Sequence, residues 1–213
     1  MNQGAGAYDA MFEVLSTAEA DRVTALYAPL AEAVRELIDA TIRTEADDVV
    51  ARARTEIEAV TALLRQRTRP VGVSFRVDGR TLPLGNAVVG LCNPIAPPIV
   101  VHHDGDGRCH SEFFLGSAYE GPPGLVHGGV SALVLDHMLG EAASDGLSKA
   151  RFTGTISVKY LRGTPLGPLR CDAWIDRSEG VKVFARGTIS DAKGVTVESE
   201  GVFIEPAWAR EAP

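Results

Sequence analysis

The stretch Glu120-Gly121-Pro122-Pro123-Gly124-Leu125-Val126-His127-Gly128-Gly129 decides the fold of this chain, because a turn-forming half leads directly into an apolar run that ends at Ala143. The glycine and proline of residues 121–124 predict a turn. The run over residues 126–143 is too long for a strand and predicts a helix. Apolar side chains lie nearly all round this helix, so it must be covered on most sides.

Segments with a period of two lie on both sides of the predicted helix. Two predicted strands, residues 99–103 and 109–115, precede it and flank a hairpin turn at residues 104–107. Four more follow, at residues 152–161, 169–177, 181–190 and 195–205. This order favours an α+β fold in which one curled antiparallel sheet wraps round a central helix. Open edge strands in such a sheet need another copy to cover them, which predicts a homodimer or a larger symmetric oligomer.

The residues upstream of the sheet have a different pattern. Residues 17–67 contain no glycine and repeat apolar side chains at helical spacing. Pro29 suits the first position of one helix, and the acidic residues 45–48 suit the start of a second, although one long helix also fits. Residues 71–98 are rich in Gly, Pro and Asn and read as a connector. We therefore expect a helical extension at residues 1–70, a connector at 71–98 and the α+β domain at 99–206.

The composition limits the classes of function. A chain of 213 residues with 45% hydrophobic and 23% charged residues can bury one substantial core. Its net charge of −7 disfavours nucleic acid as a partner. The three cysteines are scattered, the first twenty residues contain no basic leader, and no apolar segment is long enough to cross a membrane. These features predict a soluble cytoplasmic protein. The neighbours His102 and His103 point to opposite faces of a strand, so we expect no metal site with His110 and no other cofactor.

Two features of the predicted helix could carry chemistry. Asp136 stands among apolar residues, and a buried carboxylate is rare unless it is paired; a structural acid and a functional acid are both open. His127-Gly128-Gly129 lies where the helix begins, so its backbone amides and the positive end of the helix dipole could stabilise developing negative charge. Close packing of helix on sheet is the competing reason for the two glycines.

The spacing of these features bears on the assembly. Asp136 lies seven residues beyond Gly129, which is on the order of 10 Å along one helix. One copy therefore does not bring both groups to the same carbonyl. Two antiparallel copies of the helix related by a two-fold axis can do so, which places the expected site at the dimer interface, with two sites per dimer.

These motifs resemble one family. They are similar to the hot-dog-fold acyl-CoA thioesterases of the thioesterase superfamily, in the branch that includes the phenylacetate-pathway enzyme. The similarity lies in the sequence from Glu120 to Gly129, in an acid nine residues after His127, and in the strand Phe152-Thr153-Gly154-Thr155-Ile156-Ser157-Val158-Lys159-Tyr160-Leu161-Arg162. The resemblance covers residues 99–205, about half of the chain. It implies a hot-dog fold and a homodimer or a dimer of dimers.

The resemblance also implies an activity and a set of roles. The reaction is hydrolysis of an acyl-CoA thioester to a free acid and CoA, without a metal or other cofactor. Asp136 would act as general base or nucleophile, and the amide of Gly128 or Gly129 would polarise the carbonyl. The hydroxyl of Thr153 would hold the attacking water, although strand propensity also explains a threonine there. His127 would shape the turn.

Other parts of the site are less well defined by the resemblance. Lys159 and Arg162 are similar to residues that bind the CoA phosphates, although exposed cations at a strand end are usually only solvated. Some relatives have an Asn or Gln upstream of the glycines, and here Glu120 is the possible substitute. A hydratase is a second hypothesis, but His137 lies about 100° round the helix from Asp136. A third is a non-catalytic acyl-CoA-binding or interaction protein.

Overall fold

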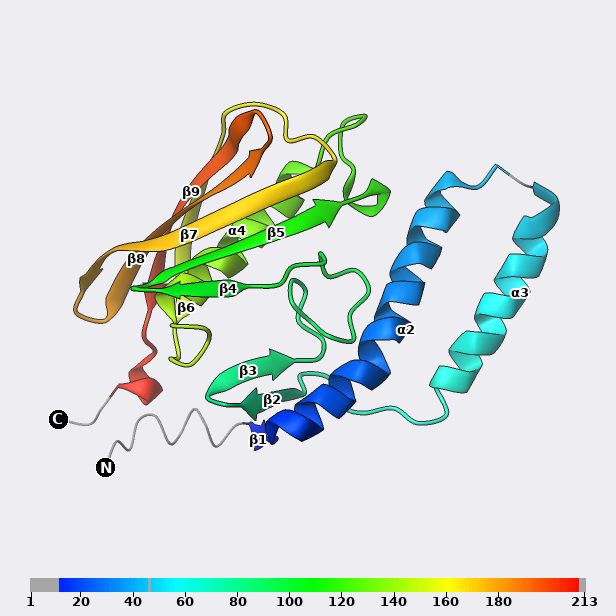
Figure 1. Cartoon of the computed structure of the whole chain (residues 1–213), viewed down its shortest axis with the longest axis horizontal. Coiled ribbons are helices and arrows are strands. Elements are labelled where there is room, and N and C mark those ends of the chain that lie inside the picture. Colours follow the sequence, from blue (N-terminus) through cyan, green and yellow to red (C-terminus); the bar gives the residue numbers. More distant parts are fainter. Residues whose placement is uncertain (1–11, 46, 211–213) are drawn as a thin grey trace.

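The computed structural model describes residues 12–45 and 47–210 of the chain (Figure 1). Its main sheet has six antiparallel strands in the order β4-β5-β7-β8-β9-β6. Their bounds are β4 His102–Gly105, β5 Arg108–Leu115, β6 Phe152–Tyr160, β7 Gly167–Glu179, β8 Lys182–Asp191 and β9 Gly194–Ile204. The sheet curls round helix α4 (Gly128–Ala143), as predicted.

The core lies between α4 and the concave face of the sheet. Alternate residues of the central strands point to the helix, and most of them are buried; the set includes Leu169, Cys171, Ala173, Val183, Ala185, Ile189, Val197 and Phe203. Val134, Leu135, Met138 and Leu139 of α4 are fully buried against them. Gly187 leaves room for the helix, because an added Cβ there would lie 2.7 Å from Cδ1 of Leu139.

One edge of the sheet is open. Within the described part of the chain, strand β6 pairs with β9 alone, and seven of its nine residues are exposed. Phe152 and Tyr160 at its two ends are each more than half exposed, and Leu133 on the neighbouring face of α4 is also exposed. An uncovered edge strand with apolar residues beside it is a surface that natural proteins cover or pair.

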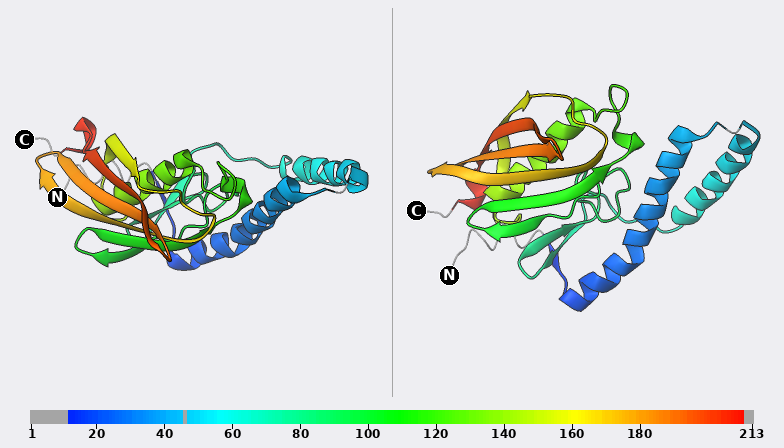
Figure 2. Two further views of the ribbon diagram at one scale, coloured as in Figure 1. Left: turned by 90° about the horizontal axis from the view of Figure 1, so that it is seen from above. Right: turned by 45° about the horizontal axis from the view of Figure 1, so that its top comes forward.

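The helical extension consists of two helices, α2 (Thr17–Arg43) and α3 (Asp47–Leu64), which project from the domain as a hairpin (Figure 2). Pro29 does not begin a helix, as the sequence suggested, but lies inside α2. The start is set instead by Ser16, whose side chain accepts the amide of Glu19 while the Glu19 carboxylate accepts the Ser16 amide. The first eleven residues of the predicted extension lie outside the described residues.

The predicted connector contains structure that the sequence analysis missed. Strands β2 (Ser74–Val77) and β3 (Arg80–Pro83) form a three-stranded sheet with the short β1 (Glu13–Val14). Asp78 and Gly79 both have positive φ angles, which makes the β2–β3 turn a tight hairpin turn, and Asp-Gly is a sequence signal for it. Within the described ranges, no helix has the length and apolar character needed to cross a membrane.

Candidate functional site

The first half of the candidate site joins α4 to the start of β6. Asp136 is half-buried on α4, and the hydroxyl of Thr153 donates a hydrogen bond of 2.9 Å to its Oδ1. The β6–β9 register shifts between Thr153 and Thr155, so that Thr153, opposite Phe203, faces the helix. The structure thus brings together two of the predicted site residues, and we call Asp136 and Thr153 the acid half.

The second half lies at the N-terminus of α4. His127 caps the helix, and its Nδ1 accepts the amide of Gly129 at 3.0 Å. The Gly128 amide, by contrast, has no hydrogen-bond partner among the described residues, because it belongs to the first turn of the helix. The hydroxyl of Tyr160 donates to the Gly128 carbonyl at 2.8 Å. We call His127, Gly128 and Tyr160 the amide half.

Tyr160 was missed by the sequence analysis, although it lies in the quoted strand motif. The signal that could have found it is strand periodicity. Residues 156, 158 and 160 lie on the side of β6 that faces α4, and the exposed polar residues between them lie on the other side. Its ring also limits the space at Gly128, where an added Cβ would lie 3.3 Å from the Tyr160 hydroxyl.

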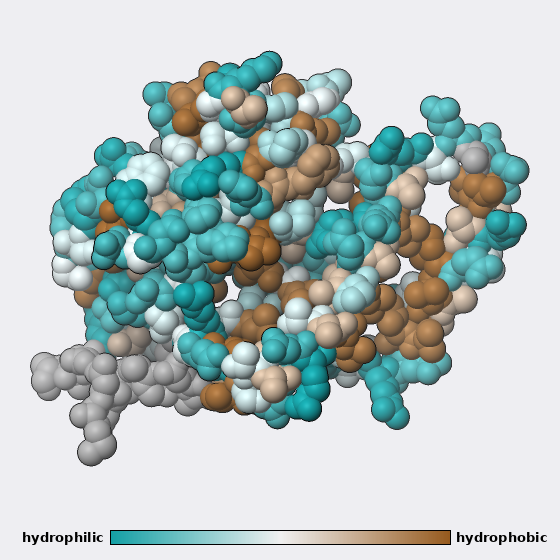
Figure 3. Space-filling model, in the orientation of Figure 1, coloured by the Kyte–Doolittle hydropathy of each residue, from teal (hydrophilic) through white to brown (hydrophobic). Residues whose placement is uncertain are grey.

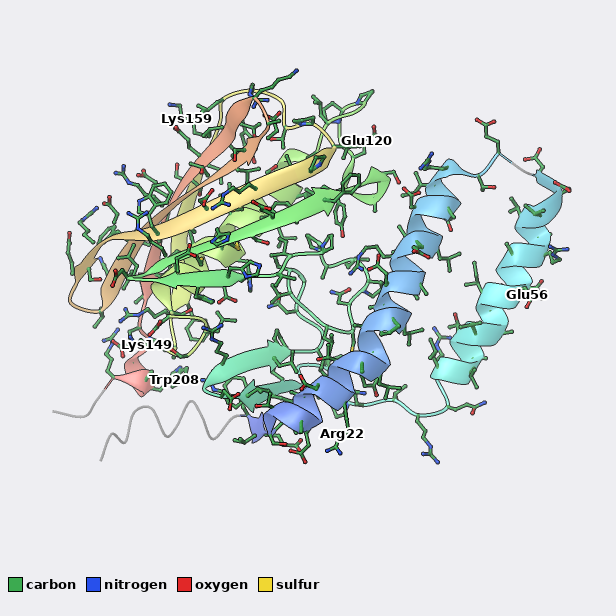
Figure 4. All side chains as sticks on the ribbon, in the orientation of Figure 1. Arg22, Glu56, Glu120, Lys149, Lys159 and Trp208 are labelled. Carbon is green, nitrogen blue, oxygen red and sulfur yellow. The ribbon has the colours of Figure 1, made fainter. Side chains whose placement is uncertain are left out.

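The turn before the helix is fixed by its own contacts. Oε1 of Glu120 accepts the Gly124 amide at 2.7 Å, so this carboxylate holds the turn. Gly121 packs against the backbone of His127, and an added Cβ would lie 2.7 Å from the His127 Cα. The turn therefore requires glycine at position 121, and Glu120 lies in it on the side of the domain nearer α2 (Figure 4).

A path of hydrogen bonds leads from this turn to the helical extension. The His127 amide donates to the Tyr119 carbonyl at 2.9 Å, in the short 3-10 helix η1 (Ser117–Tyr119). The Tyr119 hydroxyl donates to the Ala96 carbonyl in the connector at 3.0 Å. The Ser117 hydroxyl donates to Oδ1 of Asp39 on α2 at 2.5 Å. Helix α2 and the connector therefore both hold η1, which precedes the N-terminus of α4.

The two predicted CoA-binding cations are not part of either half. Lys159 is the neighbour of Tyr160 on β6, so it points to the other face of the sheet, where its Nζ lies 3.8 Å from Oε2 of Glu198 (Figure 4). Arg162 makes two hydrogen bonds to the Asp191 carboxylate, at 2.9 and 2.5 Å, and one to the Gly194 carbonyl.

A second acid of α4, Glu141, was not singled out from the sequence. Its side chain is 8% exposed and contacts His137 Nε2 at 3.1 Å and His103 Nε2 at 3.4 Å. Burial raises the pKa of Glu141, but the hydrogen bonds to both histidines outweigh burial and lower it to about 2. His137 is therefore engaged away from Asp136. Within residues 12–45 and 47–210, no His, Cys, Asp or Glu side chains form a group that could hold a metal ion.

Comparison with known proteins identifies the family. The family model of the thioesterase superfamily matches residues 123–198. A thioesterase superfamily protein of known crystal structure is 34% identical, with a TM-score of 0.74, over 84% of this chain and 94% of its own. Because the residues from Ile99 onward are only about half of the chain, that match includes much of the segment before Ile99.

Two further solved structures match the chain over about half of its length. A putative thioesterase from Ralstonia eutropha JMP134, related to phenylacetic acid degradation, is 20% identical over 50% of this chain and 83% of its own, with a TM-score of 0.47. Zebra fish thioesterase superfamily member 2 is 14% identical over 51% of this chain and 81% of its own, with a TM-score of 0.46. The match at 34% identity, together with the family model and the curled sheet round α4, shows that the chain has the hot-dog fold and belongs to the thioesterase superfamily.

Proposed function

We propose that the chain is an acyl-CoA thioesterase of the branch that includes the phenylacetate-pathway enzyme. Membership of the thioesterase superfamily supports thioester hydrolysis as the reaction class. Asp136 takes a proton from water held by Thr153, and the oxygen attacks the thioester carbonyl carbon. The carbon–sulfur bond then breaks, and the thiolate of CoA leaves and takes up the proton, which gives a free acid and CoA. Direct attack by the Asp136 carboxylate is the alternative.

The observation that carries this proposal is the hydrogen bond from Thr153 to Asp136. It fixes one carboxylate oxygen, and the other, which no described residue bonds, can accept a proton. The open Gly128 amide, at the positive end of α4, supplies a donor for the oxyanion. Because the Gly129 amide is bonded to the His127 ring, we assign the oxyanion to Gly128 and a capping role to His127.

The proposed site is shared between two copies. Gly128 and Asp136 are eight residues apart on α4, which corresponds to about 12 Å. Pairing two β6 edges in antiparallel fashion about a two-fold axis places the start of one strand opposite the end of the other. The acid half of one protomer then lies near the amide half of its partner. The exposed β6 edge and the exposed face of α4 support this homodimer, alone or within a dimer of dimers.

The substrate and the location are also parts of the proposal. We retain acyl-CoA as the substrate, with Lys159 and Arg162 at the rim as candidates for its phosphates. Both are already ion-paired, which counts against a strong contribution from either. All three cysteines are unpaired, which supports a reducing compartment such as the cytoplasm.

The first test is a steady-state assay of CoA thiol release from acetyl-, medium-chain, long-chain and aryl-CoA thioesters. Asp136→Asn should lose turnover while it keeps ligand binding. Asp145→Asn, at an exposed position just after α4, is the matched control and should behave as the wild type. If the wild type binds acyl-CoA but releases no CoA thiol, the thioesterase hypothesis is replaced by that of a non-catalytic acyl-CoA-binding protein. Hydration of an enoyl-CoA instead would favour the hydratase.

The second test removes one amide hydrogen. Gly128 is the first residue of α4, and proline is tolerated at that position because its φ angle is suitable and no intrahelical bond is lost. Gly128→Pro should therefore keep the helix and reduce kcat by about 10²- to 10³-fold. Gly128→Ala, which keeps the amide and adds a Cβ near Tyr160, should stay within a few-fold of the wild type. Equal loss in both variants would contradict the role of the amide.

Mixing these variants tests whether the site is shared. A dimer of one Asp136→Asn chain and one Gly128→Pro chain has one intact site if the two halves come from different protomers. Random co-assembly should then restore roughly a quarter of the wild-type activity. No recovery from a demonstrated mixed dimer would show that both halves act within one protomer.

A further inference from the structure

The helical hairpin carries a large uncovered apolar surface. On α2 it comprises Leu26, Leu30 and Leu37, and on α3 Val50, Ile57, Val60 and Leu64; we call these seven residues the hairpin face. Their side chains are 38–67% exposed. The space-filling view shows hydrophobic side chains along both helices and open space between the helices (Figure 3).

The hairpin face has the spacing of a helix-packing seam. With Ala53, the α3 positions follow one another at intervals of three and four residues, and with Ala33 and Ala40 the α2 positions do the same. Such a heptad pattern fits another helix, whose side chains insert between those of the seam, better than it fits a flat sheet or a small molecule.

Within the described residues, helix α3 packs little against the rest of the chain. None of its residues is buried, and it does not pack closely against α2. Helices in proteins are held mainly by packing of an apolar face, more than by the helix propensity of their residues. An assembly that covers the hairpin face would supply that packing.

The area is suited to a specific contact. Seven apolar side chains that are about half exposed present on the order of 600 Å², at the upper end for a patch on a monomer and near the roughly 800 Å² per partner of a stable interface. The chemistry argues against a lipid surface, because α2 and α3 together hold nine acidic residues, five Arg and no Lys.

We propose that the hairpin face packs against the same face of a second copy of this chain, forming a bundle of four helices. The face contains no charged side chain, so pairing it with itself buries no like charges, as a two-fold contact requires. The open β6 edge already favours assembly of copies of this chain, so a second hairpin is available at equal stoichiometry. This interface is separate from the site and does not depend on the proposed activity.

The test places charge on α3, none of whose residues is buried. The variant I57E/V60E disrupts the hairpin face, and A59E/A62E puts the same charges on the opposite, exposed side of α3 as a control. Light scattering during size exclusion gives the mass, and hydrogen exchange reports the protection of α3. We expect an oligomeric wild type with protected α3, a smaller assembly with unprotected α3 for I57E/V60E, and wild-type behaviour for A59E/A62E.

Three outcomes would overturn the proposal. The first is an I57E/V60E chain with the wild-type mass and a protected α3. The second is a wild type in which α3 is unprotected. The third is binding of the wild type to vesicles of anionic lipid that I57E/V60E abolishes without a change in mass, since it would make a membrane the occupant. Loss of CoA thiol release in the assays above, with the mass results as expected, would refute the activity alone.

Discussion

The contacts of Glu141 with His103 and His137 permit a quantitative prediction about the free energy of unfolding. Glu141→Gln keeps the size of the side chain and removes its charge, so it imitates the protonated carboxyl group. In the wild type, burial raises the pKa of Glu141, but the hydrogen bonds to His103 and His137 lower it from 4.5 to about 2. The charged form is therefore the one that the folded chain stabilises.

The size and the pH range of the effect follow from that shift. At about 1.36 kcal/mol for each pKa unit, the charged carboxylate contributes about 3 kcal/mol to the free energy of unfolding. The folded pKa is the depressed one, so this contribution is complete above pH 4.5 and is lost as the pH falls through 2. Between pH 5 and pH 3 the wild type should lose about 2 kcal/mol that Glu141→Gln does not.

Urea unfolding at one protein concentration, at pH 5 and at pH 3, measures the difference. Glu141→Gln should be less stable than the wild type by about 3 kcal/mol at pH 5 and by about 1 kcal/mol at pH 3. Asp145→Asn changes an exposed acid at a position of positive φ that asparagine tolerates, and it should change the free energy by less than about 0.5 kcal/mol. A difference for Glu141→Gln that is absent at pH 5, or equal at both pH values, would refute the reasoning.

Three further outcomes can be measured simply. Gly121→Ala should lower the melting temperature and abolish activity, because its methyl group would lie 2.7 Å from the His127 Cα; scanning fluorimetry and the thiol assay check this. Ser117→Ala should increase hydrogen exchange in residues 119–129 by breaking the contact with α2, whereas Ser117→Thr, which keeps the hydroxyl, should not. In the native chain, a thiol reagent should modify Cys92 at most, since the other two thiols are buried and burial raises their pKa values; all three should react in denaturant.

The sequence predicted the parts of the fold that follow from local periodicity. The apolar run of α4 and the alternating strands after it lie within a few residues of their predicted bounds, because their hydrophobic period is set by the core that they share. Strands β2 and β3 were not predicted, because each is only four residues long and they lie among Gly, Pro and Asn residues. The helical pattern was expected from residue 17, but the helix start expected at Pro29 was wrong, because the capping box at Ser16 begins α2 and Pro29 lies inside it.

The candidate site could be predicted where it depends on the type of residue, but not where it depends on which groups are hydrogen-bonded to each other. Asp136 and Thr153 were both proposed from the sequence, and the structure brings them into contact. Which glycine amide is open could not be predicted, since that depends on the rotamer of His127. Likewise, the sequence did not reveal that Arg162 is bound to Asp191, because the two residues are 29 positions apart.

The hydrogen bonds between α2, η1 and His127 bear on how this chain can be divided. A gene fragment that begins at Ile99 would encode every strand of the main sheet, but it would lack Asp39 and the Ala96 carbonyl, to which η1 is anchored. A designer who transplants the hot-dog part into a fusion, or exchanges it with that of a relative, must therefore carry the upstream helix and connector along with it. The smallest transferable unit is defined by these anchors and not by the boundary of the sheet.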